Sequence, residues 1–259
     1  MSFRRLGEIA EREMRHKIYG VVVGVVTNNK DDKGHYRVKV RFPWLPNGGD
    51  QNAEESDWCR IATPMAGDQR GLFLLPEVGD EVLIAFEHGD IGRPFVVGML
   101  WNGKDKEIYD NKSQNGKNNM RGFKSRSGHV FEFCDDKDNK KEKITIKTAA
   151  GARVVLDDSD NGKKIEIYDD QSNNYVLIDA QNKKITMESK NGDILIKAKQ
   201  KIQLQAQSIE TKSDNDTKME AGANFEAKAS SNMTLKASGQ GELNASGTLT
   251  VKGSTVNIN

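Results

Sequence analysis

The last third of the chain repeats every eight residues, and this repeat restricts the fold more than any other feature. Six octads follow one another without a gap from residue 209 to residue 256, and the first, third and fifth positions of each octad are mostly apolar or small. Alternation of this kind is typical of short strands with one inward face, and the Ser, Asn, Gly and Gln residues near the end of each octad suit corners. Residues 194–206 extend the pattern upstream, with a slip of one residue before Ile209. The sequence therefore predicts a winding ribbon of short strands.

The inward residues of this ribbon are too few and too small to form a core within one chain. Residues 193–259 contain Phe225 as their single aromatic residue, whereas ordering the backbone costs roughly 1–2 kcal/mol per residue. Three chains that share one axis would pair their strand edges and bring small residues together from three sides. We therefore expect an intertwined homotrimeric β-helix. Its predicted core residues are Ile194, Ile196, Ile202, Leu204, Met219, Ala221, Ala227, Ala229, Leu235, Ala237, Leu243, Ala245, Val251 and Gly253.

The first part of the chain has a conventional globular composition. All five prolines and all three tryptophans lie between residues 43 and 101. Residues 1–17 carry apolar residues at a spacing of four and predict a short amphipathic helical arm. Residues 18–103 predict a small barrel of five short strands separated by Gly- or Pro-marked turns. The expected strands lie near residues 18–27, 36–42, 58–63, 81–86 and 95–101.

A second repeat, with a period near 22 residues, fills residues 127–191. Segments that begin at residues 127, 150 and 172 each contain a strand pattern, an acidic turn and a second strand of the form K-I-x-I or K-I-x-M. They predict a neck of stacked hairpins. Residues 104–126 are expected to be a linker, and residues 192–259 are the octad-repeat needle.

The sequence predicts no catalytic, cofactor-binding or metal site. Cys59 and Cys134 lie on strand patterns, where a small buried residue is expected. The histidines are scattered singly at positions 16, 35, 88 and 129, and we expect them to be exposed or in turns. Acidic clusters at residues 135–138, 157–160 and 169–170 lack the glycine and the closing glutamate of an EF-hand loop, so they predict turns.

Charge and targeting signals exclude further classes. A formal net charge of +1, from 39 basic and 38 acidic residues, does not fit a strongly basic nucleic-acid binder. The charged N-terminal segment does not resemble a signal peptide. We therefore expect assembly in the cytoplasm without a signal peptide.

The barrel segment carries a family resemblance. PEVGDEVLIAFEHGDIGRPFVVGMLWNG, from Pro76, resembles the OB-fold domain of VgrG-type spike proteins and of phage baseplate assembly protein V, and GHYRVKVRFPW, from Gly34, fits that domain's earlier strands. The hairpin repeats are similar to the segment that joins barrel and needle in VgrG proteins, and the octads are similar to a trimeric β-helical needle. The resemblance implies an all-β fold: an OB-fold barrel followed by hairpin repeats and an intertwined trimeric needle, with a short N-terminal helix.

The same resemblance implies a function and partners. It points to a non-enzymatic, membrane-puncturing central spike of a contractile injection system, which is a phage tail, an extracellular injection particle or a type VI-like apparatus. About 17 residues precede the barrel, so we expect a separate trimeric hub protein at the N-terminal end. The octads run undiminished to the C-terminus, so we expect a PAAR-like tip protein there. The predicted tip-binding residues are Val256, Asn257, Ile258 and Asn259. No cofactor is expected, and contact with the target membrane would be transient.

Two other classes of function remain open at this point. One is an OB-fold module that binds nucleic acid or another ligand and carries a β-solenoid tail. Arg37, Lys39 and Arg41 form a basic face, but Tyr36 and Phe42 alternate onto the opposite face, where we expect them to serve the core. The other is a β-helical polysaccharide-cleaving enzyme, which needs paired carboxylates in a cleft, and the inward octad positions carry no acid.

Overall fold

The computed structural model describes residues 17–46, 55–110, 112, 115–160 and 162–258. The chain divides into two compact units, Met1–Leu195 and Ile196–Asn259, which are described separately below. The first unit contains a barrel and a sheet, and the second contains the octads. Residues 1–16 of the helical arm predicted over residues 1–17, including His16, lie outside the described residues, and Lys17 is not helical.

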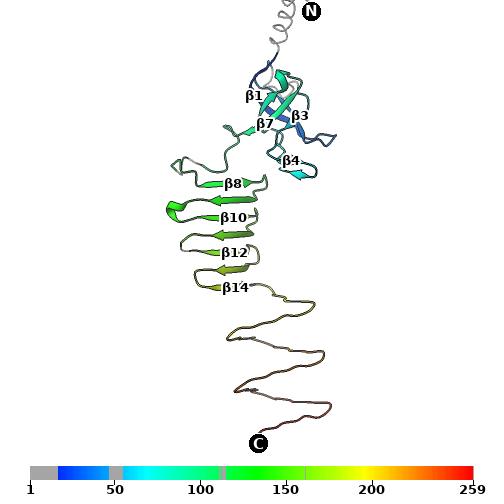
Figure 1. Cartoon of the computed structure of the whole chain (residues 1–259), viewed down its shortest axis with the longest axis vertical. Coiled ribbons are helices and arrows are strands. Elements are labelled where there is room, and N and C mark those ends of the chain that lie inside the picture. Colours follow the sequence, from blue (N-terminus) through cyan, green and yellow to red (C-terminus); the bar gives the residue numbers. More distant parts are fainter. Residues whose placement is uncertain (1–16, 47–54, 111, 113–114, 161, 259) are drawn as a thin grey trace, which may run out of the picture. The chain divides into compact units, whose positions relative to one another are not determined.

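Five strands form a closed barrel (Figure 1). They follow the order β1 (Val21–Asn28), β2 (Arg37–Arg41), β3 (Cys59–Ile61), β7 (Pro94–Leu100) and β6 (Glu81–Phe86). Strand β3 pairs with β7 in parallel, and the other neighbours are antiparallel. This confirms the five predicted strands in a five-stranded barrel of the OB type.

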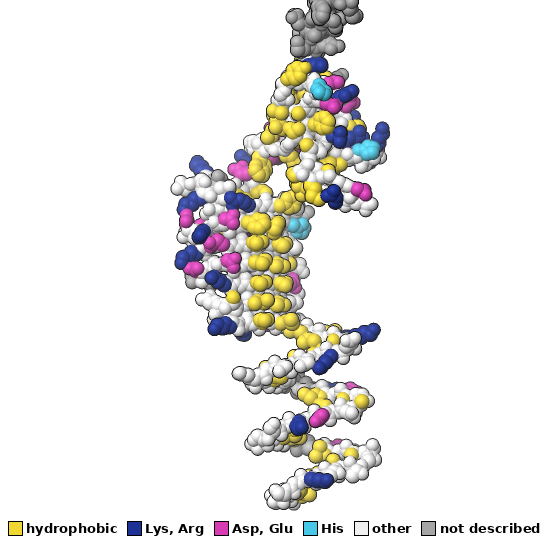
Figure 2. All heavy atoms as spheres, viewed as in Figure 1, with side chains coloured by type: hydrophobic (Ala, Val, Ile, Leu, Met, Phe, Trp, Pro, Cys, Tyr) yellow, Lys and Arg dark blue, Asp and Glu magenta, His cyan; other side chains and the backbone are white. Residues whose placement is uncertain are grey.

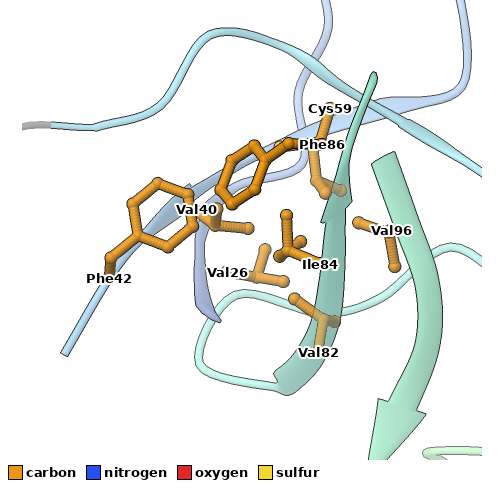
Figure 3. Packing of buried hydrophobic residues seen from close by; sticks show 9 residues of the cluster. Val26, Val40, Phe42, Cys59, Val82, Ile84, Phe86 and Val96 are labelled. Carbon is orange, nitrogen blue, oxygen red and sulfur yellow. The ribbon is translucent and has the colours of Figure 1, made fainter. Parts of the chain in front are cut away.

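Alternating side chains from these strands fill the barrel (Figure 3). Strand β2 turns Val38 and Val40 inward, with no exposed surface, while Arg37, Lys39 and Arg41 alternate onto the other face. Gly24 in β1 allows close packing, because a Cβ there would lie 3.2 Å from Ile84 Cγ1. The core residues are Val26, Val38, Val40, Phe42, Cys59, Val82, Ile84, Phe86 and Val96.

Tyr36 departs from the predicted pattern. Phe42 is buried as expected, but the prediction that Tyr36 serves the barrel core is wrong. Tyr36 precedes β2 with a φ of 54°, and this left-handed conformation takes it out of the strand alternation. Its ring packs against Phe73 at a centroid distance of 4.9 Å, and its hydroxyl accepts a hydrogen bond from the Leu74 N–H. Tyr36 thus supports the loop that contains the small hairpin of β4 (Ala66–Gly67) and β5 (Arg70–Gly71).

Seven antiparallel strands form a second sheet, in which sequence neighbours pair. The strands are β8 (Met120–Lys124), β9 (Val130–Cys134), β10 (Lys143–Lys147), β11 (Arg153–Asp157), β12 (Lys164–Asp169), β13 (Asn174–Asp179) and β14 (Lys184–Glu188). The three predicted hairpins are confirmed as β9 with β10, β11 with β12, and β13 with β14. Strand β8 pairs with β9 and comes from residues expected to form a linker.

The acidic clusters form turns, as predicted. Asp136 precedes the 3-10 helix η2 (Lys137–Asn139), and its carboxylate accepts from the Asn139 N–H. The Asp157 carboxylate accepts from the Ser159 N–H at 2.9 Å, and that of Asp169 accepts from the Gln171 N–H at 3.2 Å. The 3-10 helix η1 (Glu87–Gly89) forms a further turn, between β6 and β7.

The second unit is a ribbon that reverses direction at regular bends (Figure 1). From residue 214 onward, bends fall at residues 214–215, 222–223, 230–231, 238–239, 246–247 and 254–255. These are the sixth and seventh positions of each octad, so the predicted corners are confirmed. A bend at residue 207, seven residues before the bend at 214, matches the slip of register before Ile209. Among the described residues of this unit no backbone segment forms a strand, so the short strands predicted for the octads do not form within the single chain.

Candidate functional site

One face of the seven-stranded sheet carries at least one apolar residue from every strand. In β12, Ile165 and Ile167 point to this face, and Lys164, Glu166 and Tyr168 point to the other, because successive side chains alternate. The strand register aligns these apolar residues into two columns that cross the sheet (Figure 2). One column contains Phe123, Phe131, Ile146, Val154, Ile167, Val176 and Met187, and the other contains Phe133, Ile144, Leu156, Ile165, Ile178 and Ile185. We call these thirteen residues the apolar face.

Much of the apolar face is exposed in the single chain. Ile185 is 72% exposed, Ile167 is 52% exposed and Leu156 is 42% exposed. Soluble monomers rarely expose so long a contiguous apolar surface, and such a surface usually marks a site of protein or membrane contact. The apolar face is therefore a candidate assembly surface.

The opposite face of the sheet satisfies its polar groups within the chain. Arg153 Nε donates to Glu166 Oε1 at 2.7 Å, and Lys164 Nζ donates to Glu166 Oε2 at 2.9 Å. The Arg153 guanidinium also lies 4.1 Å from the centroid of the Tyr168 ring. Burial disfavours the charged form of Glu166, but hydrogen bonds from Lys164 and Arg153 outweigh burial, and the pKa of Glu166 is lowered. Since this face has its own partners, the two faces of the sheet are chemically distinct.

The structure places the predicted trimer-core residues on the surface of the single chain. Every described residue from 190 to 258 is exposed, including Leu235 at 84% and Leu243 at 77%. No predicted core residue of the second unit is buried by another part of its own chain. Ile194 borders the same surface hollow as Met187 of the apolar face. Of the predicted tip-binding residues, Val256, Asn257 and Ile258 are exposed, and Asn259 lies outside the described residues.

The apolar face was not among the core residues predicted from the sequence. The pattern that indicates the apolar face was present in the K-I-x-I and K-I-x-M strands, which carry an apolar residue at every second position. What the sequence lacked was the register that aligns these pairs across strands and adds Phe123 from β8.

The reactive side chains of the described residues are dispersed. Among them, no group of three or more His, Cys, Asp or Glu side chains is arranged to hold a metal ion. Cys59 is buried in the barrel as predicted, and burial raises the pKa of its thiol, whereas Cys134 is only half-buried. His35, His88 and His129 are exposed, as predicted. Neither described 3-10 helix has the length and hydropathy needed to cross a bilayer.

Fold and sequence comparison together define the class of the barrel. Residues 22–101 match the family model of the type VI secretion system/phage-baseplate injector OB domain, and these residues contain all five barrel strands apart from the first residue of β1. The barrel is therefore an injector OB domain.

The chain is also similar to named spike proteins, which confirms the predicted resemblance to VgrG-type proteins. It is 26% identical over 172 residues to the type VI secretion system spike protein VgrG1c of Pseudomonas aeruginosa, covering 66% of this chain and 22% of VgrG1c. It is 30% identical over 133 residues to VgrG1a of the same organism, covering 51% of this chain and 20% of VgrG1a. It is 37% identical over 73 residues to VgrG3 of Vibrio cholerae, covering 28% of this chain and 7% of VgrG3. The matched part is thus about a fifth, or less, of each relative's length.

Proposed function

We propose that the chain is a structural, membrane-puncturing central spike of a contractile injection system and that it acts as a homotrimer. The observation that carries this proposal is the apolar face, which crosses seven strands and is exposed in the single chain. It occurs in a chain whose barrel is an injector OB domain. Three sheets that turn their apolar faces toward one axis would bury them and leave the polar faces in water.

The octads favour three copies around the axis. Ala221, Ala229, Ala237 and Ala245 recur at the fifth octad position, and Gly253 follows. Small residues at this position suit an axis on which side chains converge from several chains. Strand edges that are open in one chain would be paired by the neighbouring chains, and pairing removes the aggregation hazard of open edges.

In this proposal the chain is not an enzyme. Contraction of the surrounding machine supplies the force, and the spike transmits it. A separate trimeric hub protein would bind the N-terminal end, and a PAAR-like tip protein would contact Val256, Asn257, Ile258 and Asn259. The spike would assemble in the cytoplasm and be ejected toward a target cell, with transient membrane contact and no bound nucleic acid. The support for these partners is the similarity to proteins named as type VI secretion system spike proteins.

The assembly surface can be tested by matched substitutions. Ile185→Asp on the apolar face and Leu235→Asp in the octads would each place three carboxylates near one axis, where desolvation and repulsion both oppose charge. Thr186→Asp and Lys236→Asp are the controls, because each lies one residue away on the opposite face.

Native mass spectrometry of the four purified variants gives the result. We expect trimer yield to fall by about tenfold or more for Ile185→Asp and Leu235→Asp and to stay close to wild type for both controls. Equal trimer yields in all four variants would contradict the proposed interface.

The proposed tip contact has its own test. Binding of a tip protein is measured for the full trimer and for a trimer truncated before Leu249, and equal binding by the two would contradict the proposed tip contact.

A further inference from the structure

A row of cationic and aromatic side chains crosses three strands on the outer surface of the barrel. Arg37 of β2 lies directly opposite Arg60 of β3, and Arg60 lies opposite Phe95 of β7. Figure 2 shows Lys, Arg and His side chains, together with Asp and Glu side chains, on one side of the barrel. Like charges directly opposite one another on neighbouring strands are destabilising, so this arrangement needs a compensating interaction.

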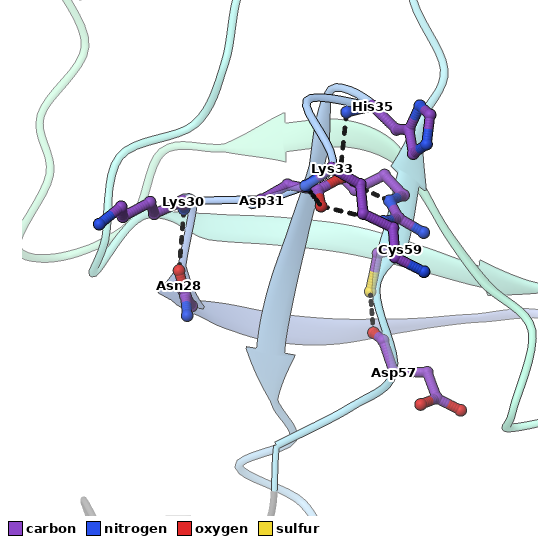
Figure 4. A network of polar contacts seen from close by, with 8 residues as sticks. Asn28, Lys30, Asp31, Lys33, His35, Asp57 and Cys59 are labelled. Carbon is purple, nitrogen blue, oxygen red and sulfur yellow. Dashed lines mark hydrogen bonds and ion pairs between the residues drawn. The ribbon is translucent and has the colours of Figure 1, made fainter.

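Arg37 has that compensation within the chain. Its Nε donates to Asp31 Oδ2 at 2.7 Å and its Nη2 donates to Asp31 Oδ1 at 2.9 Å. The Asp31 carboxylate also accepts from the backbone N–H groups of Lys33 and His35 (Figure 4). Hydrogen bonding from Arg37 is the largest cause of a pKa for Asp31 well below its usual range. The positive charge of Arg37 is therefore neutralised by a bidentate pair.

Arg60 is exposed and has no carboxylate partner among the described residues. Its guanidinium carbon lies 5.5 Å from the centroid of the Phe95 ring. A guanidinium held against a ring keeps N–H groups in its own plane, and these match the two oxygens of a carboxylate. Arg60 is thus held in place with an unused pair of donors.

The surroundings of Arg60 form a hollow of about 560 Å³. Its charged lining consists of Arg37, Arg60 and Arg93 against the single carboxylate of Glu87, which accepts from Arg93 at 3.3 Å. Trp58 and Phe95 supply aromatic walls. Arginine and tryptophan are the residue types that most often dominate binding energy at protein interfaces.

The aromatic faces in this hollow distinguish a protein partner from a nucleic acid. Single-stranded nucleic acid binds by stacking bases on open aromatic faces. Here Arg37 and Lys39 each lie 5.6 Å from the Trp58 centroid, and Arg60 lies over Phe95. Because cations already occupy these rings, the free recognition group is the Arg60 guanidinium, which fits an acidic side chain.

We propose that the hollow around Arg60 is a docking site for an acidic segment of a partner protein, with a carboxylate bound bidentately by Arg60 and flanking apolar side chains against Trp58 and Phe95. This site lies on the barrel and shares no residue with the apolar face or the octads. Charge complementarity between Arg60 and the acidic segment would fix its position.

The test uses the full chain and three labelled probes. These are a short peptide of alternating Glu and Leu, the corresponding peptide of Gln and Leu, and a thymidine-only single-stranded oligonucleotide. Fluorescence polarisation measures binding to wild type, Arg60→Gln, Arg60→Lys and Arg70→Gln. Arg70 of β5 is the matched control, since it is another exposed arginine of the same unit.

We expect saturable binding of the Glu–Leu peptide and none of the Gln–Leu peptide. Loss of a charge-assisted bidentate contact should weaken binding by about tenfold in Arg60→Gln, with Arg60→Lys between this variant and wild type. Arg70→Gln should bind like wild type. The proposal is overturned if Arg60→Gln binds as tightly as wild type, if Arg70→Gln loses as much affinity, if the Glu–Leu peptide does not bind, or if the oligonucleotide binds more tightly than the peptide.

Discussion

Gly122 in β8 lies against the hydroxyl of Tyr109, which donates to Glu132 Oε2 at 2.9 Å. A Cβ at residue 122 would collide with Tyr109 Oη and lie 2.9 Å from the Phe131 carbonyl oxygen. Burial, followed by the hydrogen bond to Glu132, raises the pKa of Tyr109 to about 12. At the scale of single residues, the lack of a side chain at Gly122 thus allows Tyr109, in the segment before β8, to pack against the sheet.

Gly122→Ala should break this contact. We expect a loss of unfolding free energy of about 1–3 kcal/mol in urea titration, because the added methyl group overpacks the site. The pKa of Tyr109 should also shift toward its ordinary value of 10.0 in an absorbance titration. Gly103→Ala is the matched control, since nothing lies within 4 Å of a Cβ there. Equal stabilities of the two variants would contradict the proposed role of Gly122.

The Asp31–Arg37 pair predicts a pH dependence of barrel stability. The pKa of Asp31 is lowered in the folded chain from its ordinary value of 3.8. A carboxyl group of this kind adds stability above that ordinary value, and the stability is lost as the pH falls toward the folded-state pKa. Asp31→Asn should therefore be less stable than wild type at pH 7, and the difference should shrink below about pH 4.

Denaturant unfolding at a series of pH values measures this difference. Asp32→Asn, at the next residue along the loop, is the control, and we expect it to follow wild type throughout. A stability difference between Asp31→Asn and wild type that does not change with pH would show that the ion pair is not its cause.

At the scale of elements, the regular patterns were the predictable part. The Val-rich and alternating runs located the barrel strands, and the octads located the corners. The sequence did not predict β8, because Met120–Lys124 lies outside the hairpin repeat and joins the sheet only by pairing with β9. The two columns of the apolar face depend on pairing between strands, which no single strand pattern specifies. Tyr36 was misplaced because its positive φ interrupts the alternation.

The octad period makes a prediction about deletions. Removal of residues 233–240 deletes one whole octad and keeps the later residues on their faces. Removal of Gly239 alone shifts the chain by one residue and turns every later inward side chain outward. We expect the octad deletion to form trimers close to wild-type yield and the single deletion to lose them. Native mass spectrometry and resistance to proteolysis measure both outcomes. Equal tolerance of the two deletions would contradict an eight-residue register.

At the scale of the whole molecule, nearly all of the buried core in the described residues lies in the barrel. Of the ten hydrophobic residues that are buried in the described part of the chain, nine belong to the barrel cluster, and Val155 is the tenth. The sheet and the octads instead expose their apolar side chains. A chain of 259 residues normally buries most of the surface that its unfolded form exposes. Association with other chains must therefore stabilise the sheet and the octads.

The oligomeric state of the full chain tests this claim most directly. Sedimentation equilibrium and native mass spectrometry should show a particle with three times the mass of one chain. Circular dichroism during dilution should show the β-structure of the sheet and octads lost together with the trimer, while the barrel, which has its own core, stays folded. A stable monomer that keeps the same β-structure and resists proteolysis over residues 120–259 would contradict the account.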